Sequence, residues 1–283
     1  MRINTNVSSL TAQEAAQNTT KTITSSLEKL STGLKINKAS DDASGLAIAD
    51  KLRTQATSIN QGIANGNSAV ALLQIADKSM GEQSNILDTV KAKLIQANTD
   101  TTSQDGRNAI AKDIKKLLTQ LNNIASQTNY NGTALLQAAA SAAGTGSSAG
   151  LKFQIGEKSS DIISNGGIRS NTTGLSLTTL AGLSAAGLTK TVAGAQQTSI
   201  DSAITKLNGY RGDIGSTQNQ VESAVRNLMT QATNVKAAES IIRDVDYAAE
   251  SANFNKQNII AQAGSYAISQ ANAVQQNVTR LLQ

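Results

Sequence analysis

The sequence predicts a mainly α-helical protein, an elongated antiparallel helical bundle or coiled coil with paired N- and C-terminal helices and a small central β-hairpin region. Two observations predict this fold class. Apolar residues recur at alternating steps of three and four over most of the chain, which is typical of helices that bury one narrow stripe. A central segment lacks this spacing and is rich in Gly, Ser, Thr and Ala, which indicates hairpins and loops.

Both ends of the chain carry a thin apolar seam, and we expect these seams to pack in the core of an assembly. The N-terminal packing positions are Ile3, Val7, Leu10, Ile23, Leu27, Leu30 and Leu34. The C-terminal seam consists of Ile260, Ala263, Ala267, Ala271, Val274, Val278 and Leu281, and its apolar surface is widened by Ile259, Tyr266 and Leu282. The C-terminal helix therefore offers apolar residues on more than one side.

Between the two seams, the same spacing predicts three further helices. Ser40, Asp41 and Asp42 predict a helix start, because short polar side chains can accept hydrogen bonds from free backbone amides. The pattern then continues to Leu94 and is interrupted from Thr99 to Gly106. A shorter helix follows, with apolar residues at Ile110, Ile114, Leu117, Leu121 and Ile124. A long returning helix is predicted from Ile200 to Val245.

Changes in composition divide the chain into three parts. Residues 1–42 and 243–283 form a terminal coiled-coil domain, and residues 43–136 and 196–242 form a helical rod. Residues 137–195 form an exposed insert, too short for large outer domains. Within the insert, the runs Leu151–Ile155 and Leu175–Leu180 are β-prone. If the insert makes the turn, the two chain ends lie side by side.

The terminal helices should need partners beyond each other. Ordering the backbone costs roughly 1 to 2 kcal/mol per residue, whereas a buried methylene group contributes only about 0.8 kcal/mol. A seam largely of alanine offers little apolar area to a single partner. Our hypothesis is that the ends fold only when many copies surround them, so that folding and polymerisation are coupled. The alternative is a soluble coiled-coil bundle that forms no polymer, and the apolar pattern alone does not separate the two.

The composition argues against an enzyme and against several kinds of ligand. The chain has no histidine and no cysteine, which removes the usual zinc ligands and thiol nucleophiles, and no carboxylate spacing indicates a catalytic, cofactor or metal site. The net charge is +5, but basic residues alternate with acids and aromatics are few, so we expect no nucleic-acid partner. No apolar run is long enough for a signal peptide or for membrane insertion, so work outside the cell would require another export route.

Four segments resemble the signatures of bacterial flagellins. They are STGLKINKASDDASGLAIA at 31–49, NTNVSSL at 4–10, TNYNGTALL at 128–136 and RDVDYAAESANFNKQNIIAQAGSYAISQANAVQQNVTRLL at 243–282. The resemblance implies a subunit that polymerises into the flagellar filament for swimming motility, with paired terminal helices at the filament core and a rod outside them. The alternatives are a hook-filament junction protein, which shares such ends, or a minor flagellin. An enzymatic flagellin with an H-E-x-x-H insert is excluded by the absence of histidine.

The resemblance also implies partners and a location. Flagellins of this kind leave the cell unfolded through the flagellar export channel, with an export chaperone on the C-terminal helix, and fold on assembly beneath a filament cap. The expected partners are therefore other copies of the chain, the chaperone, the cap and hook-associated proteins. The expected location is the extracellular flagellum.

One segment departs from many flagellins. Where they carry a Q-R-V-R-E-L-A-V-Q stretch that Toll-like receptor 5 recognises, residues 88–96 are DTVKAKLIQ. Thr89 replaces an arginine, Ala92 a glutamate and Lys93 a leucine. Losing a charge-assisted pair and burying an ammonium group would weaken a receptor interface by several kcal/mol. The pattern resembles the evasive flagellins of the Campylobacter and Helicobacter group, and the alternative is drift on a helix face of no importance to a receptor.

Overall fold

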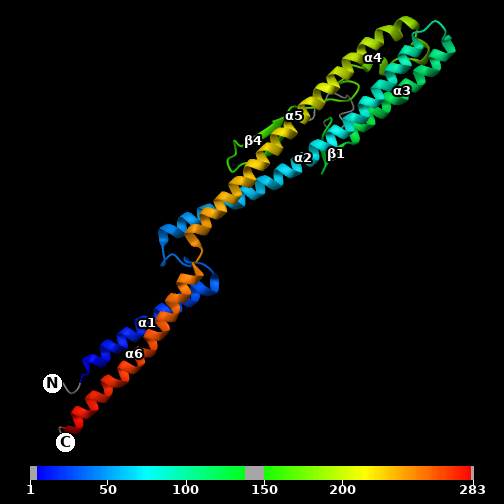
Figure 1. Cartoon of the computed structure of the whole chain (residues 1–283). Coiled ribbons are helices and arrows are strands. Elements are labelled where there is room, and N and C mark those ends of the chain that lie inside the picture. The colour runs from blue at the N-terminus through cyan, green and yellow to red at the C-terminus, as the bar shows by residue number, and fades with distance from the viewer. Residues whose placement is uncertain (1–4, 138–149, 282–283) are drawn as a thin grey trace. The chain divides into compact units, whose positions relative to one another are not determined.

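The structure is a computed structural model that describes residues 5–137 and 150–281 of the chain, without the side chains of Gln275 and residues 278–281 (Figure 1). The expected mainly helical fold is confirmed. The helices are α1 (Val7–Thr32), α2 (Ala43–Ala97), α3 (Gln104–Gln127), α4 (Thr178–Ala181), α5 (Lys190–Arg243) and α6 (Tyr247–Leu281), with a 3₁₀ turn at Ala185–Gly187. The strands are β1 (Asn129–Tyr130), β2 (Thr133–Ala134), β3 (Leu151–Gln154) and β4 (Ile162–Asn165).

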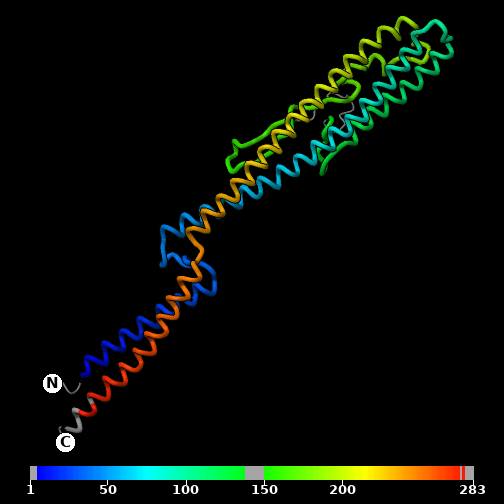
Figure 2. Tube along the Cα trace, viewed as in Figure 1, coloured from blue at the N-terminus to red at the C-terminus, as the bar shows by residue number. Residues whose placement is uncertain are grey.

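The chain forms two compact units. Unit 1 consists of Met1–Ala56 and Thr233–Gln283, and unit 2 of Thr57–Ala232. Helices α2 and α5 contribute residues to both units, whereas α1 and α6 belong to unit 1 alone. Figure 2 traces the chain through each of them.

Unit 2 has an aliphatic core between α2, α3 and α5. On α2, Leu73, Met80, Leu87 and Leu94 are fully buried and recur every seven residues. This spacing is typical of a helix that packs against its neighbours along one face. Helices α3 and α5 supply the rest of this core. Their most deeply buried apolar residues are Ile114, Leu118, Leu121 and Ala125 of α3, and Ala193, Ile200, Ala203, Leu207, Ile214 and Val221 of α5. The predicted middle helices and the break between α2 and α3 are confirmed.

Two antiparallel hairpins lie in unit 2. Strand β3 pairs with β4 over four residues, which confirms the strand expected at 151–155. Strands β1 and β2 are joined by Asn131 and Gly132, whose φ angles are 50° and 80°. Positive φ at both turn residues is typical of a type I′ turn, for which Asn-Gly is a preferred sequence.

The prediction of a strand at Leu175–Leu180 was wrong, because the structure has no strand there. The Asn171 side chain accepts a hydrogen bond from the Gly174 backbone amide at 2.7 Å, and Ser176 has a φ of 64°. These features form a tight turn that leads into α4. Leu175 and Leu180 are nonetheless buried. The apolar residues of this segment therefore pack in the core of unit 2 without forming a strand.

Helix α5 begins earlier than its first predicted apolar position at Ile200. Its first turn follows Thr189, whose hydroxyl accepts a hydrogen bond from the Val192 amide at 3.4 Å and whose carbonyl accepts one from Ala193 at 2.9 Å. Ala193 is fully buried. The first residues of α5 are mostly small and resemble the preceding loop in composition. The apolar pattern therefore did not predict this part of the helix.

A glycine in α2 allows close packing against the β3–β4 hairpin, and its replacement should destabilise unit 2. A Cβ atom on Gly62 would lie 1.9 Å from the carbonyl oxygen of Ile155, which belongs to the backbone and has little freedom to move. We expect Gly62→Ala to lower the free energy of unfolding by roughly 1 to 3 kcal/mol, the usual effect of overpacking. Denaturant unfolding followed by circular dichroism measures the change.

Gly209→Ala is the matched control, because a Cβ atom on this α5 residue meets nothing within 4 Å. This variant should gain about 0.5 to 1 kcal/mol from the better helix propensity of alanine. Equal effects of the two substitutions would show that the close approach at Gly62 does not constrain the fold.

Candidate assembly surface

Helices α1 and α6 pack side by side and antiparallel within unit 1 (Figure 1). Near the start of α1, the Asn6 side-chain amide donates to the carbonyl of Ala271 at 3.0 Å. Near the end of α1, the Asn253 side-chain amide donates a hydrogen bond to the Ser26 hydroxyl at 3.5 Å. These two contacts lie at opposite ends of the pair and fix its register.

The seam between α1 and α6 consists largely of small and polar residues. Its half-buried or buried positions recur at alternating steps of three and four, as expected for a coiled coil. The positions that follow this spacing are Ser9, Ala12, Ala16, Thr19, Ile23, Ser26 and Leu30 on α1, and Glu250, Phe254, Gln257, Ala261, Gly264, Ile268 and Ala271 on α6. Ser26 alone among the described residues of α1 is classed as buried. The pair therefore encloses very little apolar area.

Several large apolar residues of α6 point away from this seam, whereas Phe254 and Ile268 lie within it. Ile259 and Tyr266 are 67% and 74% exposed, and Ile260, Ala263, Ala267 and Val274 are exposed as well. At 3.6 residues per turn, Ile259, Ala263 and Tyr266 project to the side of α6 opposite the seam, and Ile260, Ala267 and Val274 lie along its flank, so that the six form one exposed band. We name them the outer stripe of α6. They include most of the packing positions predicted for the C-terminal end, while Ala271 lies in the seam.

The predicted N-terminal positions divide between the seam and the surface. Ile23 and Leu30 lie in the seam and Leu34 is half-buried, whereas Val7, Leu10 and Leu27 are exposed. Ile3 and Leu282 lie outside the described residues, as do the side chains of Val278 and Leu281.

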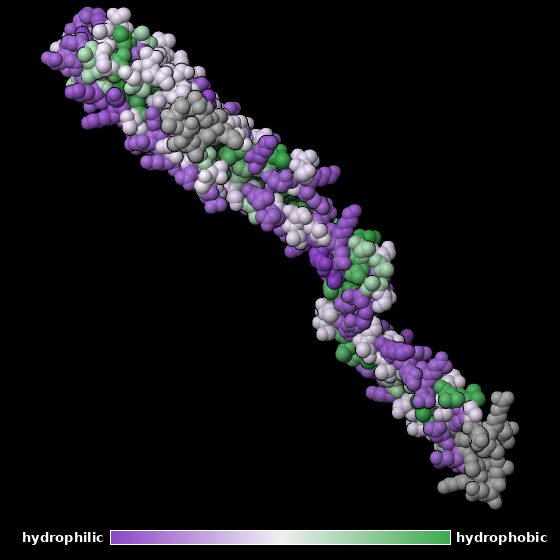
Figure 3. All heavy atoms as spheres, turned by 180° about the vertical axis from the view of Figure 1, so that it is seen from behind, coloured by the Kyte–Doolittle hydropathy of each residue, from purple (hydrophilic) through white to green (hydrophobic). Residues whose placement is uncertain are grey.

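Exposed large apolar residues are concentrated in unit 1. Of the fifteen such residues among the described part of the chain, ten belong to this smaller unit. Figure 3 shows apolar atoms at the surface of unit 1 between hydrophilic ones. A band of large exposed apolar residues on one helix, such as the outer stripe of α6, is typical of a protein interaction site. Unit 1 therefore carries the candidate assembly surface.

The predicted signature turn connects α1 to α2 and is held by two carboxylates. Asp41 accepts hydrogen bonds from the backbone amides of Asn37 and Lys38 at 3.0 and 3.1 Å, and Asp42 accepts one from Gly45 at 2.9 Å. Asp42 thus caps the start of α2, as expected, while Ser40 is simply exposed. The two hydrogen bonds to Asp41 stabilise its charged form and lower the pKa of this carboxyl group.

The signature turn is tied to the connection between α5 and α6. The Lys35 amide donates to the Arg243 carbonyl at 2.6 Å, and the Val245 amide donates to the Gly33 carbonyl at 3.0 Å. Gly33 ends α1 with a φ of 74°, and the Tyr247 hydroxyl leaves no room there for a side chain. Sequence reasoning missed this bridge. Gly33 just after a helical pattern was the available signal for the end of α1, but nothing local indicated its partner.

An ion pair supports the same region. The Lys38 ammonium group lies 2.7 Å from the Glu28 carboxylate, and this hydrogen bond, together with the attraction between the charges, raises the pKa of Lys38. Both side chains are substantially exposed, so the pair contributes to orientation more than to stability.

The predicted receptor-evasion positions lie on α2 in unit 2. Thr89 and Ala92 are exposed, and the Thr89 hydroxyl donates to the Asn85 carbonyl of its own helix at 2.9 Å. The Lys93 ammonium group lies 3.0 Å from the Asp113 carboxylate on α3. Lys93 is therefore paired within the chain.

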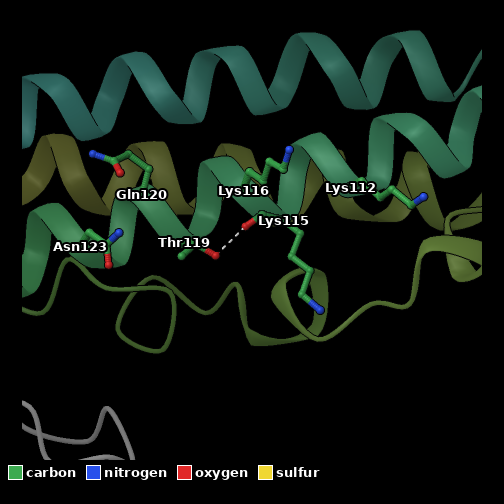
Figure 4. Close-up of a pocket in the computed structure, with 6 residues that line it drawn as sticks. All are labelled: Lys112, Lys115, Lys116, Thr119, Gln120 and Asn123. Atoms are coloured by element: carbon green, nitrogen blue, oxygen red, sulfur yellow. Dashed lines mark hydrogen bonds between the residues drawn. The ribbon is translucent and has the colours of Figure 1, made fainter.

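The described residues offer little to a small ligand or a metal ion. They contain no group of three or more metal-binding side chains. A surface groove of about 420 Å³ follows α3 and is lined by Lys112, Lys115 and Lys116. Figure 4 shows that these three ammonium groups diverge, as on a solvated helix face. Among the described helices, none combines the length and apolarity needed to cross a membrane.

Comparison with known proteins identifies the family of the chain. Residues 3–141 match the bacterial flagellin N-terminal helical region, and residues 197–282 match the bacterial flagellin C-terminal helical region. The chain belongs to the bacterial flagellin family. Flagellins are structural subunits of the flagellar filament, and a hook-filament junction protein is not favoured.

This flagellin is similar along its whole length to a filament protein of comparable size. It is 33% identical to the flagellar filament 33 kDa core protein of Treponema phagedenis, and the match covers both proteins completely. It is 39% identical to flagellin A of Helicobacter pylori over 90% of this chain but only 48% of that relative. The flagellin thus resembles the Helicobacter group in sequence and lacks much of that relative's length.

A solved structure supports the fold. A Vibrio parahaemolyticus protein described as flagellar hook-associated superimposes with a TM-score of 0.59 over 72% of this chain and 99% of that chain, at 13% identity. At that identity the likeness concerns the fold alone.

The contribution of Asp41 should depend on pH. Because its folded-state pKa lies below the ordinary value of 3.8, the stabilisation is complete above that value and disappears as the pH falls through the folded-state pKa. We expect Asp41→Asn to destabilise the flagellin at neutral pH, by an amount that shrinks as the pH falls below about 4. Thermal denaturation at a series of pH values measures the difference.

Asp88→Asn is a suitable control, since Asp88 is an exposed residue of α2 in unit 2, outside the turn. A gap between Asp41→Asn and wild type that stays constant down to the lowest pH would contradict the role given to the two backbone hydrogen bonds.

Proposed function

We propose that this flagellin polymerises into the filament through unit 1, with the outer stripe of α6 packed against other copies. The observation that supports this proposal is the exposure of Ile259, Ile260 and Tyr266 on α6, beside a seam with α1 that is made largely of small and polar residues. Full burial of an isoleucine or valine contributes about 1.5 to 3 kcal/mol. Several such residues would supply to a polymer the stabilisation that the α1–α6 pair lacks.

The same surface suggests how the subunit travels and folds. An exposed stripe that holds Ile259, Ile260 and Tyr266 would aggregate in the cell, so an export chaperone on the C-terminal helix would have to cover it before secretion. The flagellin would pass unfolded through the export channel to the extracellular flagellum and fold at the growing tip beneath the cap. Hook-associated proteins, which share the helical ends, would complete the filament at its junctions, and the product would serve swimming motility.

Within this scheme, the three-part division of the chain becomes a structural proposal. The terminal coiled coil would occupy the filament core, the helical rod would surround it, and the segment 137–195 would face outward. The small size of that segment is consistent with the full-length match to the Treponema protein. The filament would then present little surface beyond the rod.

Replacing one residue of the outer stripe should impair assembly without unfolding unit 2. We expect Ile259→Gln to raise the critical concentration for polymerisation about 10- to 100-fold, because each 1.4 kcal/mol of lost burial corresponds to a factor of ten. Sedimentation of seeded polymer across a range of protein concentrations measures this value.

Ile162→Thr provides the control, since Ile162 is a 42% exposed isoleucine on β4 of unit 2. It should leave the critical concentration unchanged. If the two variants polymerise equally well, the outer stripe does not form the contact between copies.

We further propose that this flagellin activates Toll-like receptor 5 weakly. A receptor that covered α2 would meet Thr89 and Ala92 in place of a charged pair. It would also have to desolvate the ion pair between Lys93 and Asp113. The free-energy cost of that desolvation can exceed the attraction gained between the two charges. The alternative is that these positions drifted without any effect on a receptor.

A triple variant tests this proposal. Thr89→Arg, Ala92→Glu and Lys93→Leu together should increase the response in a receptor reporter assay by at least about tenfold, the equivalent of about 1.4 kcal/mol. Lys78→Leu, on the exposed side of α2 outside the segment, should not. A strong response from the unmodified flagellin at picomolar concentration would refute the proposal.

A further inference from the structure

The β1–β2 hairpin presents an asparagine in an unusually reactive setting. Asn131 is exposed at the tip of the two-residue turn, and Gly132 follows it. A Cβ atom on Gly132 would meet nothing within 4 Å, so no neighbouring residue crowds this side of the turn. Both residues belong to the turn rather than to a strand, where local opening requires least free energy.

We propose that Asn131 is a site of spontaneous deamidation. The backbone nitrogen of Gly132 attacks the side-chain carbonyl carbon of Asn131 and forms a new C–N bond. The bond to the amide nitrogen breaks, and that nitrogen leaves as ammonia with the proton of the Gly132 amide. Water then opens the five-membered imide at either carbonyl, which gives aspartate or an isoaspartyl linkage. No oxidant, metal or enzyme is required.

The chain contains its own comparison, because four Asn-Gly dipeptides occur in it. Asn65 and Asn208 lie within α2 and α5, where the helix holds the next backbone amide in its ladder. The Asn65 side chain is further restrained, since it donates to the Gln154 carbonyl at 3.0 Å. Asn165 is buried in β4 and accepts a hydrogen bond from the Thr217 hydroxyl at 3.2 Å. Asn131 alone among the four occupies an exposed turn.

The reaction would alter the hairpin more than the core. An isoaspartyl linkage adds a methylene group to the backbone, and a two-residue turn tolerates no such addition, because turn length fixes the strand register. The pairing of Tyr130 with Thr133 would be disturbed first. Leu135 and Leu136, which follow β2, are fully buried and anchor the segment in unit 2. A modified subunit would therefore keep its fold and carry one additional negative charge at the hairpin.

Peptide mapping by mass spectrometry tests the proposal on the full-length chain. The protein is incubated in mildly alkaline buffer, in one arm folded and in the other unfolded by denaturant, and sampled over time. In the folded arm, we expect Asn131 to gain the mass of an amide-to-acid conversion at least about ten times faster than the other three sites, a difference of about 1.4 kcal/mol in barrier. In the unfolded arm, the four sites should react at similar rates.

Two further measurements make the result decisive. The variant Asn131→Gly, which tolerates the positive φ of the turn, should remove the signal while circular dichroism remains unchanged. Enzymatic methylation of isoaspartyl groups should label the Asn131 peptide of the incubated folded protein. If Asn131 in the folded arm reacts no faster than Asn208, or if Asn165 reacts first, the proposal is overturned.

Discussion

The structure depends on the seam between α1 and α6, which brings the two ends of the chain together with small side chains. Gly264 of α6 lies beside Ala16 of α1, and a Cβ atom at that glycine would reach ordinary van der Waals contact, 4.0 Å from the alanine methyl. Small side chains at this point leave the pair little apolar area to bury. Ile259, Ile260 and Tyr266 of α6 remain exposed.

Unit 2 has the opposite character. Its core contains many fully buried leucine and isoleucine residues, and its β3–β4 hairpin closes against α2 through a tight backbone contact at Gly62. A unit with such a core can be stable without partners. Unit 1 holds few buried apolar residues, among them Ile36 and Ala49 near the signature turn. In the account proposed above, unit 2 would be stable by itself and unit 1 would gain stability from other copies, a combination suited to a filament subunit.

The sequence predicted the helices well because their apolar spacing is local information. It predicted less well which side of a helix meets which neighbour. Helix α6 carries apolar residues on two sides, and periodicity alone cannot tell that Ala261 and Gly264 face α1 while Ile260 and Ala263 do not. The Leu175–Leu180 segment shows the same limit, since burial and strand formation leave similar patterns. The bridge between Leu34 and Asp244 joins loops that are distant in sequence, and no local signal predicts it.

Hydrogen exchange of the soluble flagellin and of the polymer, resolved by mass spectrometry, tests the central claim most directly. The amides of α1 and α6 should exchange rapidly in the soluble chain and become strongly protected in the polymer. Those of α2 around Met80 should be protected in both, because their core is complete within one chain. Equal protection of α1 and α6 in the two states would contradict the account, since the pair would then be stable without other copies.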